Sequence, residues 1–279
     1  MGRVRFAAHG IPILDCPECG HRFAGVLPAE SHVASVYSDD YFHGGGAGYP
    51  DYLGDGELLR QHGRRSGKLL ARFHRMGRLL DVGAAAGFLM RGIADCGWMP
   101  EGIEPNAAMA EYGRRELELT IHTGTLDTAQ PAGLFDAVSF IQVLAHLPDP
   151  LASFRRADAL TKPGGVWLVE TWDCTSRTAR MLGSAWHEYS PPSVLHWWSP
   201  RVLRRTLARF GYRLRGTGKP QKWIGLRHAK SLLLHKYGSG HAGRMLKRIP
   251  EGLALPYPSE DLFWAVFEKD GGRPSHPLH

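Results

Sequence analysis

Leu79-Leu80-Asp81-Val82-Gly83-Ala84-Ala85-Ala86-Gly87 is the most informative stretch of this 279-residue chain. It closes an apolar run of strand character, and a helical pattern follows from Phe88 to Cys96. Small residues at such a turn let the backbone approach a ligand, and the N-terminus of the following helix offers free N–H groups. The stretch therefore predicts a strand, a tight ligand-binding turn and a helix.

Predicted strands and helices alternate around this turn. An amphipathic helix is predicted over residues 57–76, before the turn, although Gly63 and Gly67 weaken this prediction. Further strands are predicted at 99–104, 119–122, 135–141, 166–171, 211–214 and 262–268, and helices at 107–117, 151–160, 175–182 and 200–210. Strands that alternate with short helices are typical of βαβ units. We therefore expect an α/β fold on a Rossmann-like, doubly wound and mostly parallel sheet.

The composition predicts a globular protein with one main domain. Hydrophobic residues make up 43% of the chain and charged residues 22%, enough to bury a sizeable core. We expect residues 57–279 to form this domain and residues 1–56, rich in Gly, Pro, Tyr and His, to form a loop-rich appendage. No run approaches 18 apolar residues, no secretory signal is evident, and four cysteines are too few for a disulfide scaffold. A cytoplasmic location is expected.

The positive charge of the chain is concentrated in one segment. Residues 201–250 contain nine Arg, five Lys and no Asp or Glu, whereas the whole chain has a net charge of +7. We expect a basic insertion at about 219–250, whose cations flank the apolar run Leu232-Leu233-Leu234. Such a helix can rest on an anionic membrane surface or contact another anionic partner. The alternative is that the leucines pack on the core and the cations are solvated.

The acidic residues Asp81 and Glu104 indicate the kind of ligand. Dinucleotide-binding turns have the pattern Gly-x-Gly-x-x-Gly, whereas this turn is Asp-x-Gly-x-Ala-x-Gly, which suits a ligand without a pyrophosphate. Glu104 ends the next predicted strand, where a carboxylate accepts hydrogen bonds from both hydroxyls of a ribose. Together the two acids predict a ligand that contains a nucleoside.

Three further motifs reveal a family resemblance. They are Phe135-Asp136-Ala137-Val138, Leu144-Ala145-His146-Leu147-Pro148-Asp149-Pro150 and Leu160-Thr161-Lys162-Pro163-Gly164-Gly165. With the turn, they make the chain resemble class I S-adenosylmethionine-dependent methyltransferases, in the small-molecule branch that includes ubiquinone-type O-methyltransferases. The resemblance covers most of the chain and implies a sheet with an antiparallel C-terminal strand.

The resemblance also implies a set of cofactor contacts. Asp81, Gly83 and Gly87 would bind the methionine end of S-adenosylmethionine, with Ala85 in place of the usual middle glycine. Glu104 would bind the ribose, and Leu126 with Asp127 the adenine edge. Gln142 would lie beside the methionine carboxylate and the transferable methyl group. In the resembled branch, an N-terminal element closes over the cofactor, and this implies lid roles for Tyr41 and Tyr52.

Two histidines are candidates for the base that deprotonates an acceptor. His146 follows the fourth core strand, and His196 lies in an aromatic segment after the fifth. Both are predicted to reach the carboxyl edge of the sheet, where ligands bind in open α/β folds. The resembled branch often has Glu where this chain has Ala145 and His where it has Val194. A His-dependent proton-transfer scheme of that branch therefore does not carry over directly to this chain.

Cys16-Pro17-Glu18-Cys19-Gly20 has the spacing of a zinc knuckle. It supplies only half of a four-ligand site, because no second Cys-x-x-Cys exists and no histidine stands at a diagnostic spacing. Zinc bound by Cys16 and Cys19 is one interpretation, and a knuckle without metal is the other.

Methyl transfer to an O or N atom of a small molecule is therefore the leading functional hypothesis, with an anionic or lipid-linked acceptor as one version. The absence of an Asn/Asp-Pro-Pro-Tyr motif and of a Pro-Cys pair after the fourth strand disfavours transfer to adenine amines and to pyrimidine carbons. Two alternatives stay open. One is an RNA methyltransferase that uses the basic 201–250 segment, and the other is a binding module without catalysis.

Overall fold

The computed structural model describes residues 2–26, 28, 32–36, 42, 51–225, 254–257 and 259–271. The strands are β1 (Arg3–Ala8), β2 (Ile11–Asp15), β3 (Arg22–Ala24), β4 (Arg78–Val82), β5 (Met99–Glu104), β6 (Thr120–Thr123), β7 (Phe135–Ile141), β8 (Thr161–Trp172), β9 (His196–Trp197), β10 (Tyr212–Gly218), β11 (Lys222–Gly225), β12 (Ala254–Tyr257) and β13 (Leu262–Lys269). The helices are α1 (His32–Val36), α3 (Gly56–Leu70), α4 (Phe88–Ala94), α5 (Ala107–Glu116), α6 (Pro150–Ala159), α7 (Arg177–Leu182) and α8 (Pro200–Arg209), with short 3₁₀ turns η1 (Leu144–His146) and η2 (Gly183–Ala185).

The main sheet has seven strands in the order β10-β13-β8-β7-β4-β5-β6. Strands β4 to β8 pair in parallel, and β13 runs antiparallel to both β8 and β10. This confirms the expected doubly wound sheet with an antiparallel C-terminal strand. The strand order reverses at β4, which pairs with β5 on one side and β7 on the other. In open α/β sheets such a reversal opens a crevice at the carboxyl ends of the strands.

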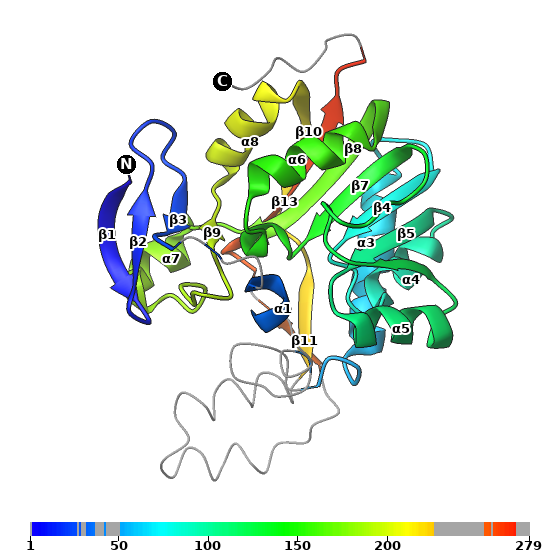
Figure 1. Ribbon diagram of the computed structural model, residues 1–279, viewed down its shortest axis with the longest axis horizontal. Helices are drawn as coiled ribbons and strands as arrows, with labels where there is room; N and C mark the ends of the chain where they lie inside the picture. Colours follow the sequence, from blue (N-terminus) through cyan, green and yellow to red (C-terminus); the bar gives the residue numbers. More distant parts are fainter. Residues whose placement is uncertain are drawn as a thin grey trace.

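Helices cover both faces of this sheet (Figure 1). Leu70 of α3 and Ile93 of α4 share one apolar cluster with the sheet, while Phe154 of α6 and Leu203 of α8 share another. Helices α3 and α4 approach very closely, because a Cβ placed on Gly63 would lie 2.0 Å from the carbonyl oxygen of Leu89. The glycine that weakened the sequence-based helix prediction is therefore what allows α3 to pack against α4.

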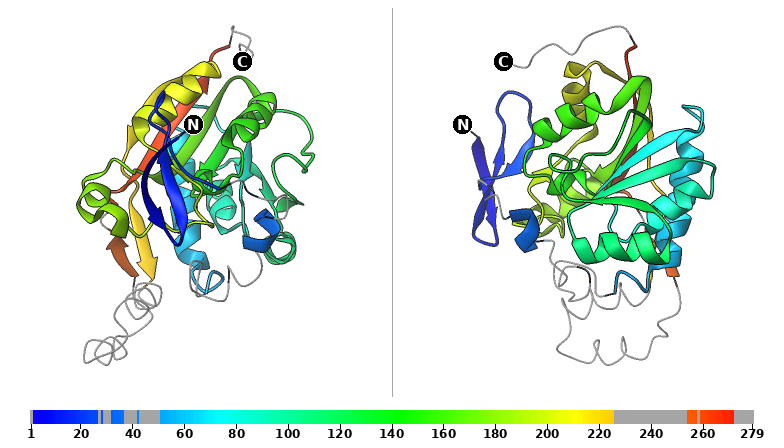
Figure 2. Two further views of the ribbon diagram at one scale, coloured as in Figure 1. Left: turned by 60° about the vertical axis from the view of Figure 1, so that its left-hand side comes forward. Right: turned by 45° about the vertical axis from the view of Figure 1, so that its right-hand side comes forward.

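The N-terminal segment contains more regular structure than the sequence predicted. Strands β1, β2 and β3 form an antiparallel sheet that is completed by β9, a strand far along the chain between α7 and α8. Figures 1 and 2 show this sheet beside the main one. The cluster beneath it includes Ile13, Trp186 and Trp197, all at most 2% exposed. These strands escaped prediction because each is short and because the fourth strand comes from 172 residues further along the chain.

Most predicted element bounds in the core agree with the structure to within two residues, and three differ more. The strand predicted at 211–214 extends to Gly218 as β10. The first helix ends at Leu70 instead of residue 76, and β8 begins at Thr161 instead of residue 166. Residues 161–165 belong to β8 because Thr161 pairs with Phe135 before a bulge in the ladder.

Of the basic insertion, residues 226–250 lie outside the described residues. Within the described helices, none is long and apolar enough to cross a bilayer.

Candidate functional site

The turn between β4 and α4 has a backbone that requires small residues. Gly83 and Gly87 have φ angles of +76° and +84°, in the left-handed region that glycine enters without strain. A Cβ on Gly83 would lie 2.6 Å from a methyl carbon of Val143, and one on Gly87 would lie 2.6 Å from a methyl carbon of Leu119. Ala85 also has a positive φ, +48°, which a residue with a Cβ adopts at some cost. The turn is thus held tightly against its neighbours.

Asp81 is buried beneath this turn with one oxygen unused. Its side chain is at the end of β4, and the residue is 2% exposed. The Ser139 hydroxyl of β7 donates a 2.6 Å hydrogen bond to Oδ1, whereas Oδ2 has no hydrogen-bond partner among the described residues. Burial raises the pKa of Asp81 to about 7, the Ser139 hydrogen bond opposes the rise, and the charge of Glu104 adds to it. A buried carboxylate oxygen without a donor is a place for a ligand group.

Glu104 connects the turn to the end of β5. Its two oxygens accept hydrogen bonds of 2.8 Å from the backbone N–H groups of Ala85 and Asn106, and the residue is 3% exposed. Burial raises its pKa to about 7 although both hydrogen bonds lower it. Within the described part of the chain, neither Asp81 nor Glu104 forms an ion pair with Lys, Arg or His. The edge of the sheet therefore holds two buried acids without a cation, an arrangement that favours a positively charged ligand.

The carboxyl end of β7 adds a polar network that the sequence did not predict. Gln142, with φ of +59°, donates from Nε2 to Oε1 of Glu170 at 3.0 Å. The second carboxylate oxygen of Glu170 lies 2.9 Å from Nε2 of His62. Glu170 and Ser139 are polar residues inside otherwise apolar strands, and this contrast was the available sequence signal.

Comparison with known proteins identifies this edge as part of a familiar domain. A family model described as a methyltransferase domain matches residues 57–216, which include every element of the site just described. The chain belongs to this methyltransferase family. The sequence-based assignment to class I S-adenosylmethionine-dependent methyltransferases is therefore confirmed.

Relatives and solved structures agree with this family. The chain is 30% identical over 146 residues to a ubiquinone biosynthesis O-methyltransferase from Histophilus somni, a match that covers 43% of this chain and 61% of the relative. The methyltransferase fold also superimposes on the Burkholderia thailandensis 1,6-didemethyltoxoflavin-N1-methyltransferase, bound to 1,6-didemethyltoxoflavin and S-adenosylhomocysteine. That match has a TM-score of 0.53 and 14% identity and covers 96% of this chain and 99% of the other. A SAM-dependent methyltransferase from Archaeoglobus fulgidus has a TM-score of 0.51 at 16% identity, over 78% and 99% of the two chains.

The remaining predicted cofactor residues of the methyltransferase domain lie in different settings. Leu126 is buried in the loop after β6, and its neighbour Asp127 is exposed. Tyr52 is buried, with its ring 6.1 Å from that of Phe88 at the start of α4, so it packs over the turn. Tyr41 lies outside the described residues.

The two histidines predicted as bases lie between the methyltransferase core and the N-terminal sheet. His146 Nδ1 donates to the carbonyl oxygen of Ser193 at 2.7 Å, and burial lowers its pKa although this hydrogen bond opposes the shift. His196 Nδ1 lies 3.0 Å from Nε2 of His21, and burial lowers its pKa to about 4. His196 thus belongs to β9 of the N-terminal sheet and contacts His21 beside β3 of the same sheet. The catalytic role of both residues stays a prediction.

Cys16 and Cys19 flank the turn between β2 and β3. The turn is closed by hydrogen bonds from Cys16 N to His21 O and from Gly20 N to Cys16 O. In the described part of the methyltransferase chain, no group of three or more His, Cys, Asp or Glu residues is placed to hold a metal ion. The described residues therefore do not complete the zinc site that the Cys-x-x-Cys spacing suggested.

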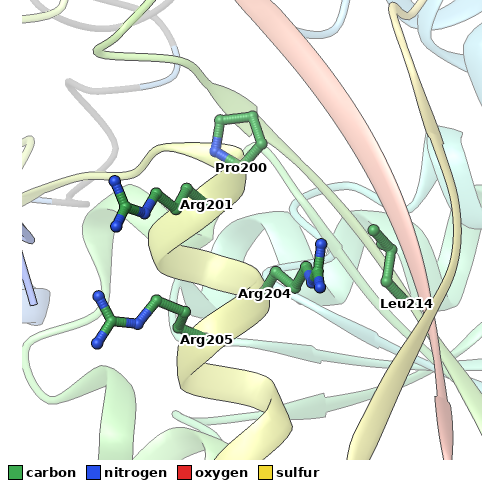
Figure 3. Close-up of a pocket in the computed structure, with 5 residues that line it drawn as sticks. All are labelled: Pro200, Arg201, Arg204, Arg205 and Leu214. Atoms are coloured by element: carbon green, nitrogen blue, oxygen red, sulfur yellow. The ribbon is translucent and has the colours of Figure 1, made fainter.

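A separate hollow lies at α8 and β10, on the side of the sheet opposite α3 and α4. It has a volume of about 390 Å³ and is lined by Pro200, Arg201, Arg204, Arg205 and Leu214. Figure 3 shows Arg201 and Arg205 on one side of α8 and Arg204 directed toward Leu214. None of the predicted cofactor or base residues lines it.

Proposed function

We propose that this protein transfers a methyl group from S-adenosylmethionine to an O or N atom of a small molecule. The observation that carries the proposal is the pair of buried acids, Asp81 and Glu104, at a glycine turn where no described cation balances them. S-adenosylmethionine has a sulfonium and an ammonium group, and these positive charges match the two carboxylates.

Each acid fits one part of the ligand. The unused Oδ2 of Asp81 can accept from the ammonium group or from a water bound to it. Glu104 already accepts two backbone hydrogen bonds, and each carboxylate oxygen has a further lone pair for a ribose hydroxyl. Leu126 and Asp127 would contact the adenine, and Gln142 would lie near the methyl group. The sulfonium supplies an electrophilic methyl and a good leaving group, so positioning by these residues provides most of the rate.

Relatives and a structural neighbour support the proposed class of acceptor. The matched relatives are named as ubiquinone biosynthesis O-methyltransferases, and one structural neighbour as an N1-methyltransferase with a bound heterocycle. Both favour a small acceptor with an O–H or N–H group. Because the matches cover about 60% of the relatives' length, the acceptor itself is a proposal of class only. An anionic or lipid-linked acceptor that uses the basic 201–250 segment is the narrower version.

The cofactor assignment is tested by titration calorimetry with S-adenosylhomocysteine. The variant Glu104→Gln should bind about 10- to 100-fold more weakly, because a charge-assisted contact is worth about 1.5–3 kcal/mol. Glu101→Gln is the matched control: Glu101 lies on the same strand, but its side chain pairs with Arg78 and His122. If both variants bind as tightly as the parent, the ribose assignment is wrong.

The RNA alternative has its own test. An RNA partner bound by the Arg and Lys residues of 201–250 would lose affinity steeply as salt rises. Absence of RNA binding at low salt would remove this alternative and leave the small-molecule proposal unchanged.

A further inference from the structure

His62, Glu170 and Gln142 form a buried network at the carboxyl edge of the main sheet. The three residues come from α3, from β8 and from the residue after β7, and they are far apart in sequence. Glu170 is 3% exposed, and the side chain of His62 is 12% exposed. A polar group so deeply buried is retained only when its hydrogen bonds repay the loss of water. Here one carboxylate joins an imidazole to an amide.

This network lies next to the cofactor turn. A Cβ on Gly83 would touch Val143, which is the neighbour of Gln142. On the other side, α3 packs on the start of α4: a Cβ on Gly56 would lie 2.7 Å from the ring of Phe88, and Gly63 lies against Leu89. His62 is thus carried by the helix that covers the turn, close to where β4 and β7 open the crevice.

The hydrogen bonds determine which nitrogen of His62 can accept a proton. An ionised carboxylate only accepts hydrogen bonds, so His62 Nε2 donates to Glu170 Oε2. The lone pair of the ring is then on Nδ1. Gln142 Nε2 donates to the other oxygen and holds the carboxylate in place. The backbone of Gln142 is in the left-handed region, and strained conformations of this kind tend to occur at functional sites.

We propose that His62 is the general base of the reaction, with Glu170 and Gln142 as positioning residues. The inference rests on the proposed function, because it assumes that the methyl donor occupies the adjacent turn. The acceptor oxygen or nitrogen uses a lone pair to bond the methyl carbon, and the carbon–sulfur bond breaks with its electron pair left on sulfur. The acceptor proton moves to Nδ1 of His62, and the resulting imidazolium returns it to water. The charge of Glu170 stabilises that imidazolium.

The geometry favours His62 over the two histidines predicted from sequence. His196 is tied to His21 within the N-terminal sheet, and His146 is tied to the carbonyl oxygen of Ser193. The charges of Glu188 and Asp149 act on the rings of His146 and His196, whereas Glu170 lies within hydrogen-bond distance of the His62 ring. His62 has a carboxylate partner within hydrogen-bond distance, and 12% of its side chain is exposed.

The first experiment measures the tautomer of His62 by NMR on protein with ¹⁵N-labelled histidine at about pH 8, without any acceptor. The signal is assigned from its loss in His62→Gln. We expect the Nε2–H form, and in Glu170→Gln we expect a mixture of both tautomers. Glu101→Gln is the control, because Glu101 contacts His122 instead. A parent that is mainly Nδ1–H, or an unchanged tautomer in Glu170→Gln, overturns the proposal.

The second experiment separates a base from a structural residue. The parent and His62→Gln are assayed with two acceptors, catechol and 4-nitrocatechol. Only 4-nitrocatechol has a first hydroxyl that is largely ionised at neutral pH. Loss of a general base should slow turnover with catechol by about 10²- to 10³-fold and with the already ionised acceptor by less than about 10-fold. His122→Gln is the matched control, because His122 contacts Glu101 within the main sheet. This variant should change neither rate. Equal losses with both acceptors would assign His62 to structure.

Calorimetry distinguishes this proposal from the one on which it rests. Binding of S-adenosylhomocysteine to His62→Gln should stay within about twofold of the parent, because His62 acts on the acceptor. If the parent itself fails to bind, the proposed function fails, whereas the NMR result still decides whether the His62–Glu170 pair exists as described.

Discussion

Two regions of the molecule bury aspartates in opposite ways. Asp15 of the N-terminal sheet pairs with Arg22 at 2.8 Å and with Arg5 at 2.9 Å, and these partners lower its pKa despite partial burial. Asp81 of the main sheet accepts a hydrogen bond from the Ser139 hydroxyl, and burial raises its pKa to about 7. The first carboxylate is satisfied by its own chain, whereas the second keeps one oxygen without a hydrogen-bond donor among the described residues. Incomplete satisfaction, and not burial alone, is what makes Asp81 the candidate for ligand binding.

The largest expected effect comes from removing the charge of Asp81. Asp81→Asn keeps the shape and can still accept from Ser139, but it loses the charge that attracts a cationic ligand. We expect S-adenosylmethionine to bind about 100-fold more weakly. The ligand-free protein should melt at a higher temperature, because an uncompensated buried charge is removed. Calorimetry and thermal melts measure the two effects, and a variant that is less stable but binds normally contradicts the comparison.

The pH dependence of binding should be the next largest effect. Asp81 and Glu104 have raised pKa values of about 7, so both lose charge as the pH falls through 7. Affinity for the cationic ligand should be full above that value, and at about pH 6 each of the two acids should reduce it by about 10-fold. Stability of the ligand-free protein should change in the opposite sense. From about pH 4 to 7 the unfolded chain releases these protons first, so stability falls as the pH rises.

The matched variants Asp81→Asn and Glu104→Gln check the origin of this dependence. Each removes one titrating group, so each should flatten the affinity profile measured by calorimetry between about pH 6 and 8. An affinity that is independent of pH in the parent contradicts the assignment of the acids to a cationic ligand.

The smallest expected effect is at the N-terminal sheet. Asp15→Asn removes the partner of Arg22 and should destabilise the protein by about 1–2 kcal/mol, because Arg22 is left half-buried without its carboxylate. The pKa of Asp15 is lowered, so the parent keeps this stabilisation above the ordinary value near 4 and loses it as the pH falls through the folded value. Denaturant unfolding measures the loss. Cofactor affinity should stay within about twofold, and a large drop would connect this sheet to the cofactor site.

The core fold was predictable because its signals are local. Phe135–Ile141 was predicted at its observed bounds, since an apolar run between turn residues marks a buried strand. The same holds for the turn, where Gly83 and Gly87 allow a positive φ that the spacing alone indicates. Asp81 and Glu104 were found by their positions at the ends of consecutive strands, because parallel strands bring such ends to one edge.

Other features depended on contacts between distant segments. The N-terminal sheet is completed by His196 pairing with Phe23, and the His62–Glu170 contact joins residues 108 positions apart. Neither pairing leaves a periodic pattern in the chain, because each residue gains its role only from a partner brought close by folding. The sequence by itself determined the alternation of strands and helices, the small-residue turn and its two acids. Only the tertiary structure decided which buried acids have partners, since satisfaction of a hydrogen bond is a property of three-dimensional neighbours.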